Sequence, residues 1–339
     1  MKNKTIFLVI LFAMTITYGC KEGAEKAKKN TNQEVVKTDV LTTFDSLNIQ
    51  IQSNPTDPLL YTKRANFYLV AGETNRALSD VNKALQLDTL NPNIWITLAD
   101  VYFASERFVD SREILLKAIN LDPQNTSGLL KLARLYFIYR EYETAMGFIN
   151  KALEIDPMLE DAYFIKGMAY AEGGDTTRAL FNYQKAVESA PDFYDAWIEL
   201  GNINAAMNNS LAQQYYQNAL DLDTNNTHAL YILAYYFQES GQLESALNTY
   251  QSLLNKEENK NALYNIAYIN LVYLEEYKEA IVYFQKTLNV DENYHDALYN
   301  LAYSLELTGD KEDARIKYKE LLKKVPNHEK ALERLNGLD

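Results

Sequence analysis

The chain has 339 residues, of which 47% are hydrophobic, so it is long enough to bury a large core or to form one long repeat array. Its net charge of −13 excludes the basic footprint that binding to nucleic acids or anionic lipid surfaces requires. Cys20 is the single cysteine, which excludes an internal disulfide and a metal site built from several thiolates.

The first nineteen residues have the three parts of a secretory signal. Residues 1–4 are basic, residues 6–16 are almost wholly apolar, and Gly19 is small. The apolar run is about half of the roughly 20 residues that a membrane-spanning helix needs, which weakens the alternative of a transmembrane anchor. We therefore expect a signal peptide over residues 1–19. Lys2 and Lys4 are its only charges, so its removal changes the net charge from −13 to −15.

Residues 17–20, Thr-Tyr-Gly-Cys, resemble a bacterial lipoprotein processing box, although Thr17 and Tyr18 differ from the residues usual there. In that family the cysteine becomes the first mature residue and carries lipid, so the resemblance implies lipidation of Cys20. Several acyl chains hold a protein firmly on a membrane. Lys21 and Glu22 loosely resemble the export tags of Gram-negative surface lipoproteins. The resemblance thus implies a lipid-anchored protein of the bacterial cell envelope, in the outer membrane of a Gram-negative bacterium.

The next segment is polar and connects the signal region to the helical part of the chain. Residues 20–40 are rich in lysine and cannot bury a core, which predicts a tether. Residues 41–57 follow as an N-terminal helix or half repeat, and Pro55 stands where a repeat would end.

A 34-residue repeat organises residues 58–328. Aligning the repeated endings gives eight repeats, which start at Pro58, Pro92, Thr126, Glu160, Tyr194, Thr227, Lys260 and His295. The eighth residue of each repeat is Ala or Gly, and a second small residue recurs further along, which lets two helices approach closely. All seven prolines fall at repeat joints. Glycines in the turn between the two helices predict left-handed C-caps at Gly72, Gly174, Gly241 and Gly309.

This pattern of large and small residues, with proline at the joints, resembles the tetratricopeptide repeat. The resemblance covers about four-fifths of the chain and implies an all-α fold, an α-solenoid of helical hairpins that forms a right-handed superhelix. Residues 329–339 are expected to form a C-terminal capping helix, because the last hairpin has no neighbour to cover its apolar face. In repeats six to eight, Leu253, Thr287 and Leu321 replace the last small alanine.

No pattern of catalytic, metal-binding or cofactor-binding residues is present in the sequence. His228, His295 and His328 each lie at a repeat start or joint, whereas a metal site needs three or four convergent ligands. Residues 172–175, Glu-Gly-Gly-Asp, lack the Lys-Ser/Thr pair of a phosphate-binding loop. We therefore expect no enzyme, cofactor, metal or nucleic-acid partner, although the sequence leaves a paired-carboxylate hydrolase open.

In the tetratricopeptide family the first helices line the concave wall, and positions five and nine of each repeat face ligands. The last three repeats hold tyrosine at both positions, as Tyr231 with Tyr235, Tyr264 with Tyr268, and Tyr299 with Tyr303. Earlier repeats offer a more apolar wall formed by Ile96, Phe103, Leu130, Phe137 and Phe164. Tyrosine is common at position five and can simply pack there, whereas asparagine is usual at position nine, so packing and binding both stay open. Tyrosine suits an interface because it combines apolar area with a hydroxyl.

The resemblance implies a membrane-anchored scaffold or adaptor that binds a protein or peptide partner in its concave groove without catalysis. An alternative is binding of glycan or peptidoglycan through the tyrosine-rich groove, and an unrecognised enzyme is a third. The groove positions lack the lysines with which co-chaperone members of the family clamp a peptide carboxylate, so that activity is not expected.

Overall fold

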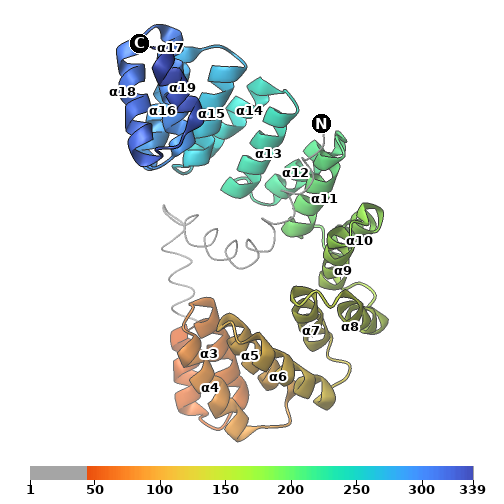
Figure 1. Ribbon diagram of the computed structural model, residues 1–339. Coiled ribbons are helices and arrows are strands. Elements are labelled where there is room, and N and C mark those ends of the chain that lie inside the picture. The colour runs from red at the N-terminus through yellow and green to blue at the C-terminus, as the bar shows by residue number, and fades with distance from the viewer. Residues whose placement is uncertain (1–43, 339) are drawn as a thin grey trace. The chain divides into compact units, whose positions relative to one another are not determined.

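The computed structural model describes residues 44–338, and all regular structure in that range is helical. Residues 44–53 are helical and lead into a series of paired helices (Figure 1). The chain divides into two compact units, unit 1 over Met1–Ile203 and unit 2 over Asn204–Asp339. Within the described residues the fold is all-α, and successive helices pack in pairs. The hand of the expected superhelix stays a prediction.

Unit 1 consists of first and second helices that alternate along the chain. Its helices are α3 (Pro58–Val70), α4 (Thr74–Leu87), α5 (Pro92–Ala104), α6 (Phe108–Leu121), α7 (Thr126–Ile138), α8 (Tyr142–Ile155), α9 (Glu160–Glu172), α10 (Thr176–Ser189) and the start of α11 (Tyr194–Ala206). The division between the two units falls inside α11.

Unit 2 continues the same alternation and ends with a single helix. Its helices are the end of α11, then α12 (Leu211–Leu222), α13 (Thr227–Glu239), α14 (Leu243–Leu254), α15 (Lys260–Val272), α16 (Tyr277–Val290), α17 (His295–Thr308), α18 (Lys311–Lys324) and α19 (Glu329–Gly337). Helix α19 packs against α18, in the place expected of a capping helix.

The first helix of every pair begins at the residue from which the repeat was counted in the sequence. In the first two repeats a proline occupies the first turn, and Asp57 or Asn91 accepts a backbone hydrogen bond as N-cap. Proline is tolerated there because the first backbone N–H groups of a helix have no partner within the helix. Asn125, Asn226 and Asn259 cap later first helices in the same way.

The turn between the two helices of each repeat contains one residue with positive φ. Gly72, Gly174, Gly241 and Gly309 adopt φ values between 75° and 89°, the left-handed conformation expected of them. The same turn position in the other four repeats is occupied by Glu106, Arg140, Asn208 and Glu275, with φ between 54° and 60°. Since a side chain costs energy in this conformation, the fold imposes the turn where the sequence does not favour it.

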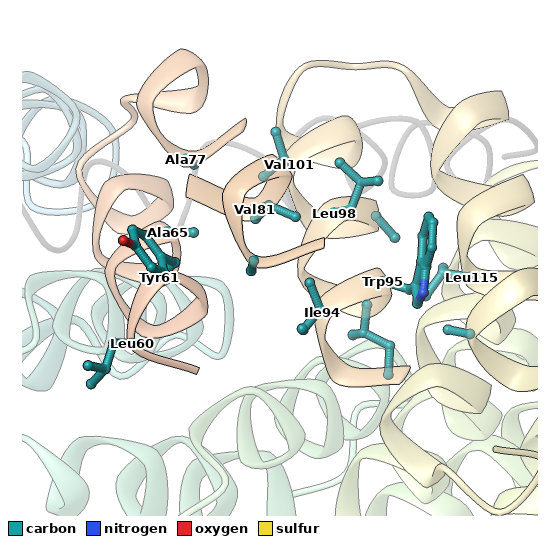
Figure 2. Packing of buried hydrophobic residues seen from close by; sticks show 14 of the residues in the cluster. Leu60, Tyr61, Ala65, Ala77, Val81, Ile94, Trp95, Leu98, Val101 and Leu115 are labelled. Atoms are coloured by element: carbon teal, nitrogen blue, oxygen red, sulfur yellow. The ribbon is translucent and has the colours of Figure 1, made fainter. Parts of the chain in front are cut away.

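The core lies between the two helices of each hairpin and between neighbouring hairpins. The small positions are fully buried, for example Ala65 and Ala77, which lie beside Val81 in the packing of unit 1 (Figure 2). Where Ser111 replaces alanine, its hydroxyl donates to the Ala99 carbonyl at 2.9 Å across the hairpin, so the polar group is satisfied.

A single position in the second helices supplies the largest buried side chains. It is aliphatic in repeats one to three and aromatic in repeats four to eight, and all eight side chains are buried: Val81, Leu115, Ile149, Tyr183, Tyr216, Tyr250, Phe284 and Tyr318. The later hairpins therefore have an aromatic core. Tyrosines of their first helices pack against these aromatic residues.

Several sequence predictions lie outside the described residues. The signal peptide over 1–19, lipidation of Cys20, the tether over 20–40 and the first residues of the segment 41–57 belong to this group. Among residues 44–338, no helix has the length and apolar character needed to cross a membrane.

Candidate functional site

The six tyrosines of unit 2 form three stacked pairs, one on each of the first helices α13, α15 and α17. The ring centroids are 6.5 Å apart for Tyr231 and Tyr235, with an angle of 11° between the rings. The pairs on α15 and α17 have the same geometry, with centroids 6.1 Å and 6.4 Å apart. Residues four apart lie on one helical face, so each helix presents its pair on the same side.

The position-five tyrosines belong to the packing of the hairpins. Each lies half-buried against the aromatic residue of its second helix, with ring centroids 5.9 Å apart for Tyr231 and Tyr250 and 5.7 Å for Tyr264 and Phe284. Tyr299 contacts Tyr318 at 6.0 Å and also stacks on the His328 ring. Part of each ring is therefore used within the fold, and a binding role for these three tyrosines stays a prediction.

Hydrogen bonds from the next repeat hold two of the three position-five hydroxyls in place. The Asn265 amide donates to the hydroxyls of Tyr231 and Tyr250, at 3.3 Å and 2.8 Å. The Asn300 amide donates to the Tyr264 hydroxyl at 3.0 Å. Burial raises the pKa of Tyr231, and the hydrogen bond from Asn265 acts in the opposite direction. These asparagines stand at position six of their repeats and connect α13 with α15 and α15 with α17.

The position-nine tyrosines are used differently from those at position five. Tyr235 is 46% exposed and Tyr268 is half-buried, and neither hydroxyl has a hydrogen-bond partner among residues 44–338. Burial, followed by the nearby Glu239 carboxylate, raises the pKa of Tyr235. The two rings therefore offer apolar faces together with hydroxyl groups that can both donate and accept.

Tyr303 differs from the other position-nine tyrosines because the capping helix covers it. The Arg334 guanidinium lies 4.3 Å from the centroid of its ring and bonds the Glu306 carboxylate at 3.1 Å. A binding role for Tyr303 stays a prediction. Its face is occupied by a side chain of the same unit.

Two position-nine residues of unit 1 form ion pairs between neighbouring repeats. Asp100 accepts from the Lys131 ammonium at 2.7 Å, and Arg134 donates to Asp161 at the same distance. Burial raises the pKa of Asp100, while Lys131 lowers it. These pairs connect one first helix to the next, so Asp100 and Arg134 contribute to the packing between repeats, and their charges are matched.

Two of the five residues of the apolar wall predicted in unit 1 are internal. Ile96 and Leu130 are only 6% and 7% exposed and pack in the core, which corrects their assignment to a binding surface. Phe164 is half-buried between Tyr183 and Phe193. The other two residues of that wall cover the hairpin turns, where Phe103 contacts Phe108 and Phe137 contacts Tyr142.

Sequence reasoning missed the residues that decide which tyrosines are accessible. Asn265, Asn300 and Arg334 all stand at position six of the following repeat, so aligning that position as well would have identified them. The described residues contain no group of three His, Cys, Asp or Glu side chains arranged to hold a metal ion.

Family models described as tetratricopeptide repeat match residues 68–129, 160–193, 228–259 and 296–328. Over 189 residues the chain is 28% identical to protein O-mannosyl-transferase TMTC3 of Homo sapiens, covering 44% of this chain and 21% of that protein. Over 151 residues it is 28% identical to type IV pilus assembly protein PilF of Pseudomonas aeruginosa, covering 42% of this chain and 58% of that one. The chain thus spans about a fifth of the first relative and somewhat over half of the second.

Among solved structures, MamA aligns with 22% identity and a TM-score of 0.42, covering 48% of this chain and 96% of that one. The APC/C hetero-tetramer Cut9–Hcn1 aligns with 18% identity and a TM-score of 0.49, covering 87% of this chain and 58% of that one. The matched residues coincide with the paired helices described above. The chain is therefore an all-α protein that contains tetratricopeptide repeats.

Proposed function

We propose that the chain is a membrane-anchored scaffold that binds a protein or peptide partner through the first helices of unit 2. The observation that carries the proposal is the pair of accessible position-nine tyrosines, Tyr235 and Tyr268. They lie on neighbouring first helices, and their hydroxyls are without hydrogen-bond partners among the described residues. Tyrosine is enriched at protein interfaces because one side chain supplies both contact area and a polar group.

The contrast between Tyr231 and Tyr264 at position five and Tyr235 and Tyr268 at position nine supports this function. A residue that only stabilised the hairpins would be expected to have its hydroxyl satisfied, as those of Tyr231 and Tyr264 are. Tyr235 and Tyr268 place equally large rings one helical turn away and leave their hydroxyls to water or to a ligand. The pilus assembly protein PilF, by its name, acts in an assembly, which agrees with a scaffold role for this chain.

The membrane attachment in this proposal rests on the sequence of the first twenty residues. Lipid on Cys20, in the envelope of a Gram-negative bacterium, would place the repeats next to a membrane, with residues 20–40 as a tether. A concave groove that holds an extended segment or a helix of the partner is the binding mode that the family resemblance implies. Binding of glycan or peptidoglycan through the same tyrosines remains the second candidate, since aromatic rings with free hydroxyls also suit sugars.

Capture of partners from detergent-solubilised membranes tests the proposal. The wild-type chain is compared with the double variant Tyr235→Ala/Tyr268→Ala, and Phe181→Ala serves as control because that ring is 61% exposed on α10 in unit 1. We expect a stoichiometric protein that the wild type and the control retain and the double variant loses, since interface tyrosines are often worth about 2 kcal/mol or more. Circular dichroism should show unchanged helicity and melting in both variants.

Two outcomes of this experiment contradict the proposal. Equal capture by all three proteins removes the tyrosines from the binding surface. Retention of saccharide or peptidoglycan fragments without a protein partner, lost in the double variant, supports the glycan candidate instead.

A further inference from the structure

The last repeat of unit 2 shows how its first-helix face holds a cation. The Arg334 guanidinium lies over the Tyr303 ring and bonds one oxygen of Glu306, and the Tyr318 hydroxyl donates to the other oxygen at 3.0 Å. An aromatic face and a carboxylate therefore hold one guanidinium between them. Both contacts favour a positive charge, the first through the ring quadrupole and the second through ion pairing.

The equivalent position in repeats seven and eight holds a shorter, neutral side chain. Counting α19 as the start of a ninth repeat places Arg334 at position six, where Asn265 and Asn300 stand. The two asparagine amides bond the position-five hydroxyls at 3.3 Å and 3.0 Å. No Lys or Arg lies over Tyr235 or Tyr268 among residues 44–338, so the interaction made by Tyr303 is not made by these two rings.

Three tyrosines and one carboxylate on α13 and at α15 supply the same kinds of group, aromatic rings and a carboxylate. Tyr273, just beyond α15, is 49% exposed and meets Tyr268 edge to face, with ring centroids 6.3 Å apart. Glu239 is exposed and lies one helical turn after Tyr235, on the same side of α13. Both Glu239 and Tyr273 are close enough to the Tyr235 hydroxyl to contribute to its raised pKa.

The side chains of this cluster are available to a ligand. The Glu239 carboxylate forms no ion pair, and the hydroxyls of Tyr235, Tyr268 and Tyr273 accept or donate no hydrogen bond, within the part of the chain that the structure describes. Residues 204–255 of unit 2 contain four acidic residues and no Lys or Arg, so no positive charge of that segment competes for Glu239. The local charge is therefore complementary to a cationic partner.

We propose that Tyr235, Tyr268, Tyr273 and Glu239 form a site for an arginine side chain of a partner peptide. The guanidinium would lie between the tyrosine rings and bond the Glu239 carboxylate, as Arg334 does with Tyr303 and Glu306. This inference rests on the proposed function and adds the chemical class of the partner, a basic peptide segment. An arginine fits better than a lysine because its planar guanidinium can stack on a ring and bond a carboxylate at the same time.

Peptide selection tests the inference. The full chain is immobilised and used to select binders from a random peptide library displayed on phage, and the selected peptides are synthesised with a fluorescent label. We expect enrichment of arginine. Replacing that arginine by citrulline, a neutral analogue of the same shape, should weaken binding about 3- to 30-fold.

Three variants of the chain locate the effect. Glu239→Gln keeps the shape of the side chain and should weaken the arginine peptides about 3- to 30-fold, while the citrulline peptides bind it as they bind the wild type. Glu244→Gln, an exposed glutamate on α14 in the same unit, should change neither affinity. The double variant Tyr235→Ala/Tyr268→Ala should lose the selected peptides altogether.

The outcomes separate this inference from the proposed function. The arginine site is overturned if the selected peptides lack basic residues, or if they bind Glu239→Gln as well as they bind the wild type. If the double variant nevertheless fails to bind such peptides, the tyrosine surface still binds peptide. Peptides that bind the double variant as well as wild type overturn both. If no peptide is selected, the inference is also overturned. The proposed function is tested separately, by the capture of a folded partner.

Discussion

Replacing Gly167 by alanine tests the close approach of the two helices in repeat four. Gly167 lies at position eight of its repeat, inside α9, and faces Tyr183 on α10. A Cβ atom built at Gly167 would lie 2.7 Å from both Cδ1 and Cε1 of the Tyr183 ring. Tyr183 is 1% exposed, and its ring contacts Phe164, so it has little room to turn away.

Two effects of opposite sign determine the change in stability. Alanine is favoured over glycine inside a helix by about 1 kcal/mol, and overpacking a filled core costs about 1–3 kcal/mol. Repeats six and eight combine alanine at position eight with buried Tyr250 and Tyr318, so α9 and α10 can reach a wider spacing, at a cost in packing. We expect a net destabilisation of about 1 kcal/mol for Gly167→Ala.

Gly147→Ala is the matched control. Gly147 lies inside α8, is exposed, and a Cβ atom there would have no neighbour within 4 Å. This variant keeps only the helix preference of alanine and should be stabilised by about 0.5–1 kcal/mol.

Urea denaturation followed by far-UV circular dichroism measures both changes. Hydrogen exchange of α9 and α10 complements it, because repeat arrays can unfold locally. Faster exchange in Gly167→Ala should be confined to repeat four and its neighbours. If the two variants shift the midpoint in the same direction by the same amount, the packing of Gly167 against Tyr183 does not limit stability and the reasoning is refuted.

Three further predictions address other parts of the chain. Burial, with the nearby Asp195 carboxylate, raises the pKa of Glu199 to about 7 from 4.5, so the folded state holds a proton that the unfolded state loses. Stability should therefore fall as pH rises from about 4.5 through 7, and Glu199→Gln should remove this loss and stabilise the chain by about 1–3 kcal/mol at pH 8, measured by denaturation across pH. Glu106→Gly should raise stability by about 1 kcal/mol in the same assay, because glycine adopts φ 59° without strain. Cys20→Ala should move the protein from the membrane to the soluble fraction, and retention after a salt wash would count against lipidation.

The hairpins could be predicted from the sequence because each repeat independently shows the same spacing of small residues and joints. The buried Ala or Gly at position eight and the prolines at the joints determine where the first helices begin, and eight copies average out local exceptions. Only half of the turns could be predicted from glycine in the sequence. Glycine marks four of them, while at Glu106 and its equivalents the packing of the hairpin imposes the same left-handed residue on a sequence that does not favour it.

The candidate site was less accessible to sequence reasoning, because it depends on contacts between neighbouring repeats. The six tyrosines share one pattern in the sequence, yet Tyr235 is the most exposed of them, and the hydroxyls of Tyr231 and Tyr264 are hydrogen-bonded while those of Tyr235 and Tyr268 are not, among the described residues. The aromatic second helices, which place Tyr250 and Phe284 against the position-five rings, are a long-range feature that the spacing of the first helices does not contain.

In the last repeat, the side chain at position six of the following helix covers the position-nine ring. A long cationic residue, such as Arg334, covers the ring of Tyr303, whereas Asn265 and Asn300 bond the position-five hydroxyls instead. In unit 1 the same position holds Lys131, whose ammonium pairs with the Asp100 carboxylate. The position-nine residue that it contacts is therefore an aspartate and presents no aromatic ring. Because each repeat contacts mainly its neighbours, one residue per repeat can switch a stretch of the array between closed packing and an accessible surface. Asn300 is half-buried, so its replacement by arginine is the change most directly aimed at covering the Tyr268 ring, whereas Asn265 is buried and bonds the Tyr250 hydroxyl, and arginine there would disturb the core.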